Sequence, residues 1–122
     1  MENISIQKQL LRKENIQTDK FPWGRLEWFA RKELNGADMT LGTCYLNPWM
    51  ENTMHSHPNC DEVLYVLEGS IRHRLNGEEV EMNEGDSLFI PKGAAHNAVN
   101  KGNTEAVLSI AFDTGDRQTE YK

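Results

Sequence analysis

The chain has 122 residues, enough for one domain with a single core, and its 13 Lys and Arg against 19 Asp and Glu give a net charge of −6. An acidic chain without a basic cluster argues against a nucleic-acid partner, because phosphate neutralisation needs a positive face, and it offers nothing basic to an anionic membrane. Its apolar runs are far shorter than the roughly 20 residues that cross a bilayer. Two cysteines are too few for a disulfide framework, so we expect a cytoplasmic protein with reduced thiols.

The chain opens on a polar segment. Residues 1–20 predict an N-terminal arm or an edge strand, in which Ile4 and Ile6 alternate with polar residues. Residues 21–122 then predict a single barrel domain of short strands separated by turn signals. Within it, residues 23–34 are ambiguous, because their aromatic side chains suit a strand while the following Asn-Gly pair marks a tight turn.

The next segments favour strands. The segment that begins at Met39 places Leu41 and Tyr45 on the same face as Met39, with Cys44 on the opposite face. Residues 63–67 are continuously apolar, which predicts a strand buried on both sides. Further strands are predicted at residues 71–75, 80–82, 87–90 and 105–112, and residues 113–122 form a polar, peripheral tail. Because the pattern contains no long helix, it predicts an all-β barrel or sandwich.

A cluster of possible metal ligands precedes the apolar strand. His55 and His57 are two residues apart, so an extended backbone places both imidazoles on one face with Cα atoms about 6.5 Å apart. Glu62 follows a Pro-Asn-Cys-Asp turn and begins the neighbouring strand. Two imidazoles and a carboxylate suit divalent Mn, Fe, Co, Ni, Zn or Cu, and the absence of thiolate argues against structural zinc. The alternative is a solvated polar loop.

A second stretch, GDSLFIPKGAAHNAVN from Gly85 to Asn100, has its glycines and proline spaced for a turn, a strand and a tight corner that leads to His96. Together the two stretches resemble the motifs of the cupin superfamily, G-x5-H-x-H-x3or4-E-x6-G and G-x5-P-x-G-x2-H-x3-N. The matching residues are His55, His57, Glu62 and Gly69 in the first motif and Gly85, Pro91, Gly93, His96 and Asn100 in the second. Trp49 departs from the pattern, since it stands where the first motif begins with glycine.

The resemblance, which covers residues 39–112, implies a double-stranded β-helix, or jelly roll, of the small single-domain microbial type. It implies that one divalent metal ion is held inside the barrel by His55, His57, Glu62 and His96. The matching glycines and proline are then turn residues of the scaffold, and Asn100 is structural. Small cupins are commonly homodimers, so the resemblance also implies a homodimer, with the N-terminal arm at the interface.

Other residues are candidates for the cavity. His73 shares a strand face with two aliphatic residues, so as an interior residue it would be a proton shuttle or a substrate contact. The alternative is a satisfied core or dimer-interface histidine. Tyr45 is a second catalytic candidate because of its hydroxyl, and the substrate-pocket candidates are Trp49, Met54 and Phe112. The alternative for these four is core packing in a small barrel.

Four protein ligands would leave two positions of a six-coordinate metal free for a small molecule. Cupins with such sites act as isomerases, lyases, decarboxylases or dioxygenases, so the resemblance implies a metal-dependent enzyme acting on a small organic molecule. The alternatives are a binding or sensing module without turnover and a purely structural barrel. No cluster of Arg and Lys adjoins the motifs, which favours a neutral or lightly charged ligand over a sugar phosphate.

Overall fold

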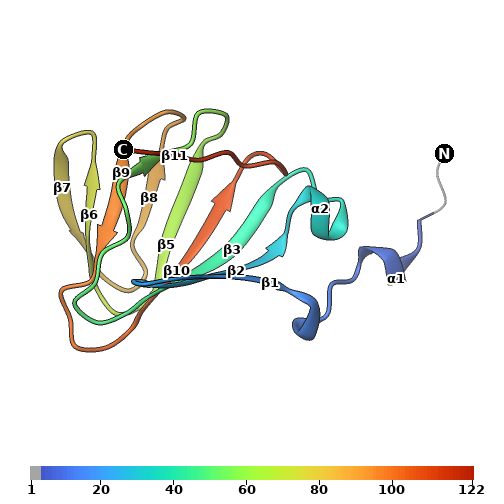
Figure 1. The fold of residues 1–122 in the computed structure, drawn as a ribbon, viewed down its shortest axis with the longest axis horizontal. Coiled ribbons are helices and arrows are strands. Elements are labelled where there is room, and N and C mark those ends of the chain that lie inside the picture. The colour runs from blue at the N-terminus through green and yellow to red at the C-terminus, as the bar shows by residue number, and fades with distance from the viewer. Residues whose placement is uncertain (1–3) are drawn as a thin grey trace.

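The computed structural model describes residues 4–122, which form two antiparallel sheets around one core (Figure 1). The first sheet has the strand order β1-β2-β3-β10-β5-β8 and the second β11-β4-β9-β6-β7. This is the predicted all-β jelly roll. The strands of the first sheet are β1 (Gln17–Phe21), β2 (Gly24–Ala30), β3 (Thr40–Leu46), β5 (Glu62–Glu68), β8 (Ser87–Ile90) and β10 (Ala106–Phe112). Those of the second are β4 (His55–Ser56), β6 (Ile71–Leu75), β7 (Glu78–Met82), β9 (His96–Val99) and β11 (Glu120–Tyr121).

The N-terminal segment leaves the barrel (Figure 1). Ile4 and Ile6 do not form a strand; Ile6 instead begins the one-turn helix α1 (Ile6–Gln9), and both side chains are about four-fifths exposed. A strand needs a partner for its backbone hydrogen bonds, and only β1, which pairs with β2 along its whole length, has one in this part of the chain. The first three residues lie outside the described part of the chain.

Within the part of the chain that the structure describes, helical structure is confined to short pieces. Besides α1 these are the 3-10 helix η1 (Lys13–Asn15) and the helix α2 (Lys32–Asn35). The ambiguous residues 23–34 contain both β2 and the start of α2, and Gly36 ends that helix with a φ of 71° that suits glycine. No helix within residues 4–122 is both long enough and apolar enough to span a bilayer.

Strand β3 shows which of its faces is the inner one. Thr40, Gly42, Cys44 and Leu46 are buried, whereas the alternate residues, including Tyr45, are only half-buried. Cys44 therefore faces the core and Tyr45 faces outward. The sequence showed that the two residues lie on opposite faces, but both faces carry apolar side chains, so burial against the second sheet decided which one turns inward.

Strand β5 is buried on one face only, so the prediction of burial on both sides is wrong. Leu64 and Val66 are buried in the core, while Val63, Tyr65 and Leu67 on the other face are 43–47% exposed. In a barrel of two sheets, one face of each sheet packs against the other sheet and no layer covers the outer face. A continuous apolar run thus produced one core face and one apolar outer face.

Candidate metal centre

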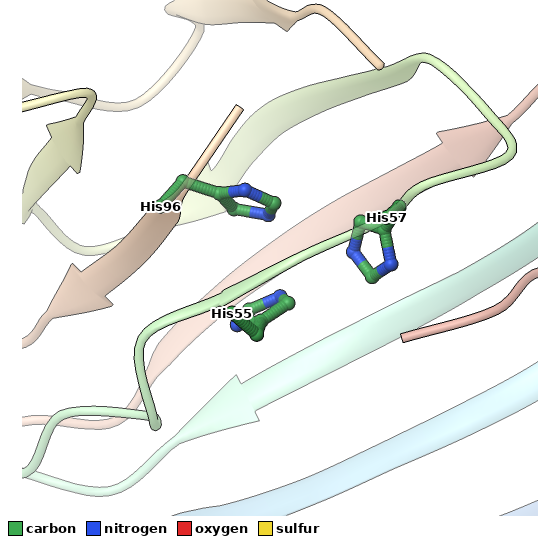
Figure 2. A group of neighbouring side chains, drawn as sticks. All are labelled: His55, His57 and His96. Atoms are coloured by element: carbon green, nitrogen blue, oxygen red, sulfur yellow. The ribbon is translucent and has the colours of Figure 1, made fainter. Parts of the chain in front are cut away.

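Three histidines converge inside the barrel. His55 is on β4 and pairs across the ladder with His96 on β9, and His57 follows β4 directly. Their potential ligand nitrogens all lie within 4.8 Å of one another, and the three rings point into a common space (Figure 2). His57 and His96 are buried and His55 is half-buried. The second motif thus provides the third imidazole, that of His96, which lies 39 residues after His57 in the sequence.

Backbone carbonyls fix the tautomer of each ring. Nδ1 of His55 lies 2.6 Å from the carbonyl oxygen of Thr53, that of His57 2.9 Å from Gln118, and that of His96 2.9 Å from Ala94. A carbonyl oxygen only accepts hydrogen bonds, so each Nδ1 carries a proton and donates it. In a neutral ring Nε2 then has a free lone pair. Nε2 of His57 is buried with no hydrogen-bond partner among the described residues, as expected of a nitrogen that serves as a metal ligand.

Glu62 lies beside these nitrogens. It begins β5 in the opposite sheet, is 4% exposed, and places Oε1 3.1 Å from Nε2 of His96 and 3.4 Å from Nε2 of His57. Burial raises the pKa of this carboxyl group, but the two imidazoles outweigh burial and lower it to about 2. Glu62 is therefore ionised at neutral pH and provides an anionic oxygen next to the three histidines.

The histidines differ in their affinity for protons. Burial lowers the pKa of His55 to about 4, and the neighbouring His96 adds to this effect. Burial also lowers the pKa of His96, but the Glu62 carboxylate more than compensates, so that the pKa is raised. Without a metal ion, His96 can therefore hold a proton on Nε2 and donate it to Glu62. A metal ion would displace that proton, since a ligating imidazole must be neutral.

A cavity of about 50 Å³ adjoins the cluster. This volume holds a few water molecules. Its walls contain the three histidines and Glu62 together with apolar residues of both sheets, such as Leu64 and Ala98. The chemistry that the arrangement allows is metal coordination next to a small, mostly apolar space.

The other candidates divide into two groups. His73 is 1% exposed, stacks on His96 with ring centroids 5.8 Å apart, and lines the cavity, as does Phe112. Its Nδ1 has no hydrogen-bond partner among the described residues, and burial lowers its pKa to about 4. It is thus an interior histidine, but not a satisfied one.

Tyr45, Trp49 and Met54 are not among the described residues that line the cavity. Tyr45 faces outward and stacks under the guanidinium of Arg25, which lies 3.7 Å from its ring centroid. Trp49 is 68% exposed with a φ of 65°, so the turn keeps the left-handed backbone that glycine normally provides there. Sequence alternation and motif position placed these residues near the site, but none of the three lines the cavity.

The C-terminal segment, predicted to be peripheral, lines the cavity with Arg117, Thr119 and Tyr121. Asn59 anchors it: its Oδ1 accepts a hydrogen bond from the Gln118 N–H, and its Nδ2 donates to the carbonyl of Asp116. This polar segment gave no signal in the sequence, because its role depends on contacts with a loop almost 60 residues away.

Asn100 is a structural residue. It is 1% exposed, and its Nδ2 donates to the carbonyl oxygens of Leu46, Asn47 and Thr104. It therefore joins the end of β3 to the loop before β10, at a distance in sequence of more than 50 residues.

Comparison with known families identifies the fold. The family model described as cupin domain matches residues 43–112, more than half of the chain and a range that contains both histidine motifs. The chain belongs to the cupin family.

This cupin is similar to the tetracenomycin polyketide synthase protein TcmJ of Streptomyces glaucescens, at 42% identity over 66 residues, which cover 54% of the chain and 44% of that protein. It is also similar to germin-like protein 1 of Brassica napus, at 33% identity over 86 residues, which cover 66% of the chain and 42% of that protein. The chain thus spans less than half the length of these two relatives.

Solved structures share the cupin barrel. The oxalate decarboxylase of Lactobacillus farciminis, solved as a formate complex, has a TM-score of 0.81 at 16% identity over 88% of this chain and 34% of its own. A recombinant oxalate oxidase, solved with glycolate, has a TM-score of 0.71 at 19% identity over 79% and 53% of the two chains. At such identities the likeness shows the fold alone.

Proposed function

We propose that this cupin binds one divalent transition metal ion, of Mn, Fe, Co, Ni, Zn or Cu, through Nε2 of His55, His57 and His96 and the carboxylate of Glu62. The convergence of three tautomer-fixed imidazoles within 4.8 Å carries the proposal. The buried, unpartnered Nε2 of His57 fits the same ion, because a polar atom removed from water is costly unless it finds a partner. Nitrogen and oxygen donors without thiolate suit these metals.

We further propose that the protein is a metal-dependent enzyme that acts on a small organic molecule in the adjoining cavity. Bound there, the ion would supply Lewis-acid or redox chemistry at its remaining coordination positions. The protein groups would do the rest. The carbonyls of Thr53, Gln118 and Ala94 hold the imidazole rings in place, and the apolar walls exclude water from the ligand.

A binding or sensing module without turnover is the second candidate, and one observation favours it. His73 is the one histidine of the cavity outside the proposed ligand set, and burial lowers its pKa to about 4. An imidazole with so low a pKa is a weak general base at neutral pH. Besides His73, the described residues that line the cavity provide no carboxylate, lysine or histidine outside the proposed metal ligands, so a reaction that needs proton abstraction by such a group would depend on His73.

The metal content of protein purified without chelators tests the site. Wild type should carry close to one equivalent after incubation with Mn²⁺, Ni²⁺ or Zn²⁺, and its melting temperature should rise by mass action. His96→Ala should carry much less. His73→Gln is the matched control, because it changes a buried cavity histidine that is not a proposed ligand, and it should keep its metal. Equal metal content in wild type and His96→Ala would refute the four-ligand site.

Turnover separates the two functional candidates. Metal-loaded wild type should consume a small molecule that His96→Ala does not consume if the protein is an enzyme. Saturable binding of that molecule without any change to it would identify a binding module.

We also propose that the protein forms a homodimer, as the resemblance implied, but through the outer face of the first sheet and not through the N-terminal arm. Val63, Tyr65, Leu67 and Phe89 are each more than 40% exposed on neighbouring strands, where Val63 pairs directly with Phe89. Exposed apolar side chains in such a group are typical of protein interfaces. Light scattering should report a dimer for wild type and a monomer for Phe89→Lys. The two free, buried cysteines fit our expectation of a reducing cytoplasmic location.

A further inference from the structure

Arg117 brings a cation to the wall of the cavity that contains the proposed metal site. It lies between the end of β10 and the start of β11. Its guanidinium carbon is 4.7 Å from the ring centroid of Trp28 and 5.0 Å from that of Phe112. The Phe112 ring in turn is 5.0 Å from the ring of His57. One aromatic ring thus separates the guanidinium from a proposed metal ligand.

The aromatic rings hold the guanidinium but do not use its N–H groups. Nε of Arg117 is buried and has no hydrogen-bond partner among the described residues. The two rings attract the guanidinium as a cation. The backbone is fixed as well, because Asn59 bonds the residues on either side of Arg117. A preorganised cation with an unpartnered donor is a ready recognition group for an anion.

With a metal ion bound, the cavity would carry a net positive charge that favours an anionic ligand. Among the described residues that line the cavity, Glu62 is the one carboxylate and Arg117 the one Arg or Lys. These two charges cancel, so a divalent ion would leave the cavity with a formal charge of +2. In a partly buried space, that excess favours an anionic ligand. The net charge of −6 elsewhere on the chain is exposed and largely screened.

We propose that Arg117 is the anion-recognition residue of this cupin and that the molecule bound beside the metal is a small carboxylate. The inference rests on the proposed metal site. A carboxylate matches the guanidinium edge through two parallel hydrogen bonds. The 50 Å³ of space admits only a few non-hydrogen atoms, and the apolar walls suit a short hydrocarbon part. A phosphate group, with its greater charge, would call for more donors than this single guanidinium.

Acetate and acetamide provide the test, since they have the same shape and differ in charge. NMR titrations would follow the Arg117 Nε–Hε resonance in zinc-loaded wild type and in protein treated with EDTA. Acetate should bind saturably to the zinc-loaded protein and acetamide roughly 10-fold or more weakly. Equal binding of the two, or no saturable shift with acetate, overturns the proposal. Tighter binding of inorganic phosphate than of acetate overturns the proposal of a carboxylate ligand and indicates a phosphate ligand instead.

Variants assign the effect to Arg117. Arg117→Met keeps the apolar stem and should weaken acetate binding roughly 10- to 100-fold, whereas Arg117→Lys should retain part of it. Arg25→Gln is the matched control, because Arg25 also stacks on an aromatic ring but lies on the outer face; its acetate affinity should equal that of wild type. Unchanged affinity in Arg117→Met overturns the role of Arg117. If Arg117→Met does not fold, the comparison of acetate with acetamide in wild type and Arg117→Lys decides.

Failure of the metal site is distinguishable from failure of this inference. If wild type takes up no metal, the proposed function fails. The titration of the metal-free protein then decides about Arg117. A saturable shift of its Nε–Hε resonance with acetate but not with acetamide supports the inference, and no such shift overturns it.

Discussion

Replacing Glu62 with Gln tests the electrostatics of the site in the absence of metal. The substitution keeps the shape of the side chain and removes its charge. A pKa lowered from 4.5 to about 2 means that the folded protein stabilises the carboxylate over the neutral acid by roughly 3 kcal/mol. Since Gln resembles the neutral acid, Glu62→Gln should lose about that amount of unfolding free energy. This is a large part of the stability of a typical domain, so the effect is easily measured.

The loss of unfolding free energy in Glu62→Gln should depend on pH. The pKa of Glu62 is lower in the folded protein, so its contribution is present above pH 4.5 and is lost as pH falls towards 2. The pKa of its partner His96 is raised above its ordinary value by the Glu62 carboxylate, so the same attraction weakens as pH rises through this raised pKa. The difference between wild type and Glu62→Gln should be greatest near pH 6 and should shrink on both sides.

Urea unfolding in EDTA, from pH 3 to pH 8, measures this difference. Glu51→Gln is the control, because Glu51 makes an exposed ion pair of 3.2 Å with Arg74, which we expect to contribute less than about 1 kcal/mol. The reasoning is refuted if Glu62→Gln costs no more than Glu51→Gln, or if its cost does not change between pH 6 and pH 3.

Three further outcomes are expected from urea unfolding in EDTA. Burial lowers the pKa of His73 from 6.5 to about 4, so its contribution to the unfolding free energy is present above pH 6.5 and is lost as pH falls towards 4. Wild type should therefore lose about 2 kcal/mol from this group between pH 7 and pH 5, and His73→Leu should not. An identical pH dependence in both proteins would contradict burial of a neutral imidazole. Gly24→Ala should lower the unfolding free energy by more than about 3 kcal/mol, because its Cβ would collide with the carbonyl oxygen of Tyr45. Gly77→Ala has open space around its Cβ and should cost only about 1 kcal/mol. Similar costs for the two variants would count against the close packing of Gly24 on the Tyr45 backbone. Asn100→Ala should cost about 2–4 kcal/mol, because it removes one donor from three carbonyl oxygens, that of Leu46 in a buried contact and those of Asn47 and Thr104 in partly buried ones. The variant should retain its metal once refolded, and lost metal at full stability would point to a role in the site instead.

The sequence by itself determined the ingredients of the candidate site. His55 and His57 had to share a face, because successive strand residues alternate. The turn before Glu62 placed the carboxylate on the next strand, where the structure has it. The second motif marked His96 as the remaining histidine, and the two strands that carry His55 and His96 are paired neighbours. The places of His55, His57 and Glu62 are short-range properties of spacing, which one chain is enough to read, whereas the place of His96 beside them was implied by the resemblance to cupins.

The tertiary structure decided what surrounds those ingredients. Alternation separated Tyr45 from Cys44 but did not say which one faces the core, and packing against the second sheet turned Cys44 inward. The apolar run of β5 is compatible with burial of one face or of both faces, so the sequence did not show that only one face is covered. Arg117 came from a polar tail whose place depends on two hydrogen bonds to Asn59. Local pattern fixes which residues lie together along a strand, while the choice of inner face and the contacts of distant segments arise only when the whole chain packs.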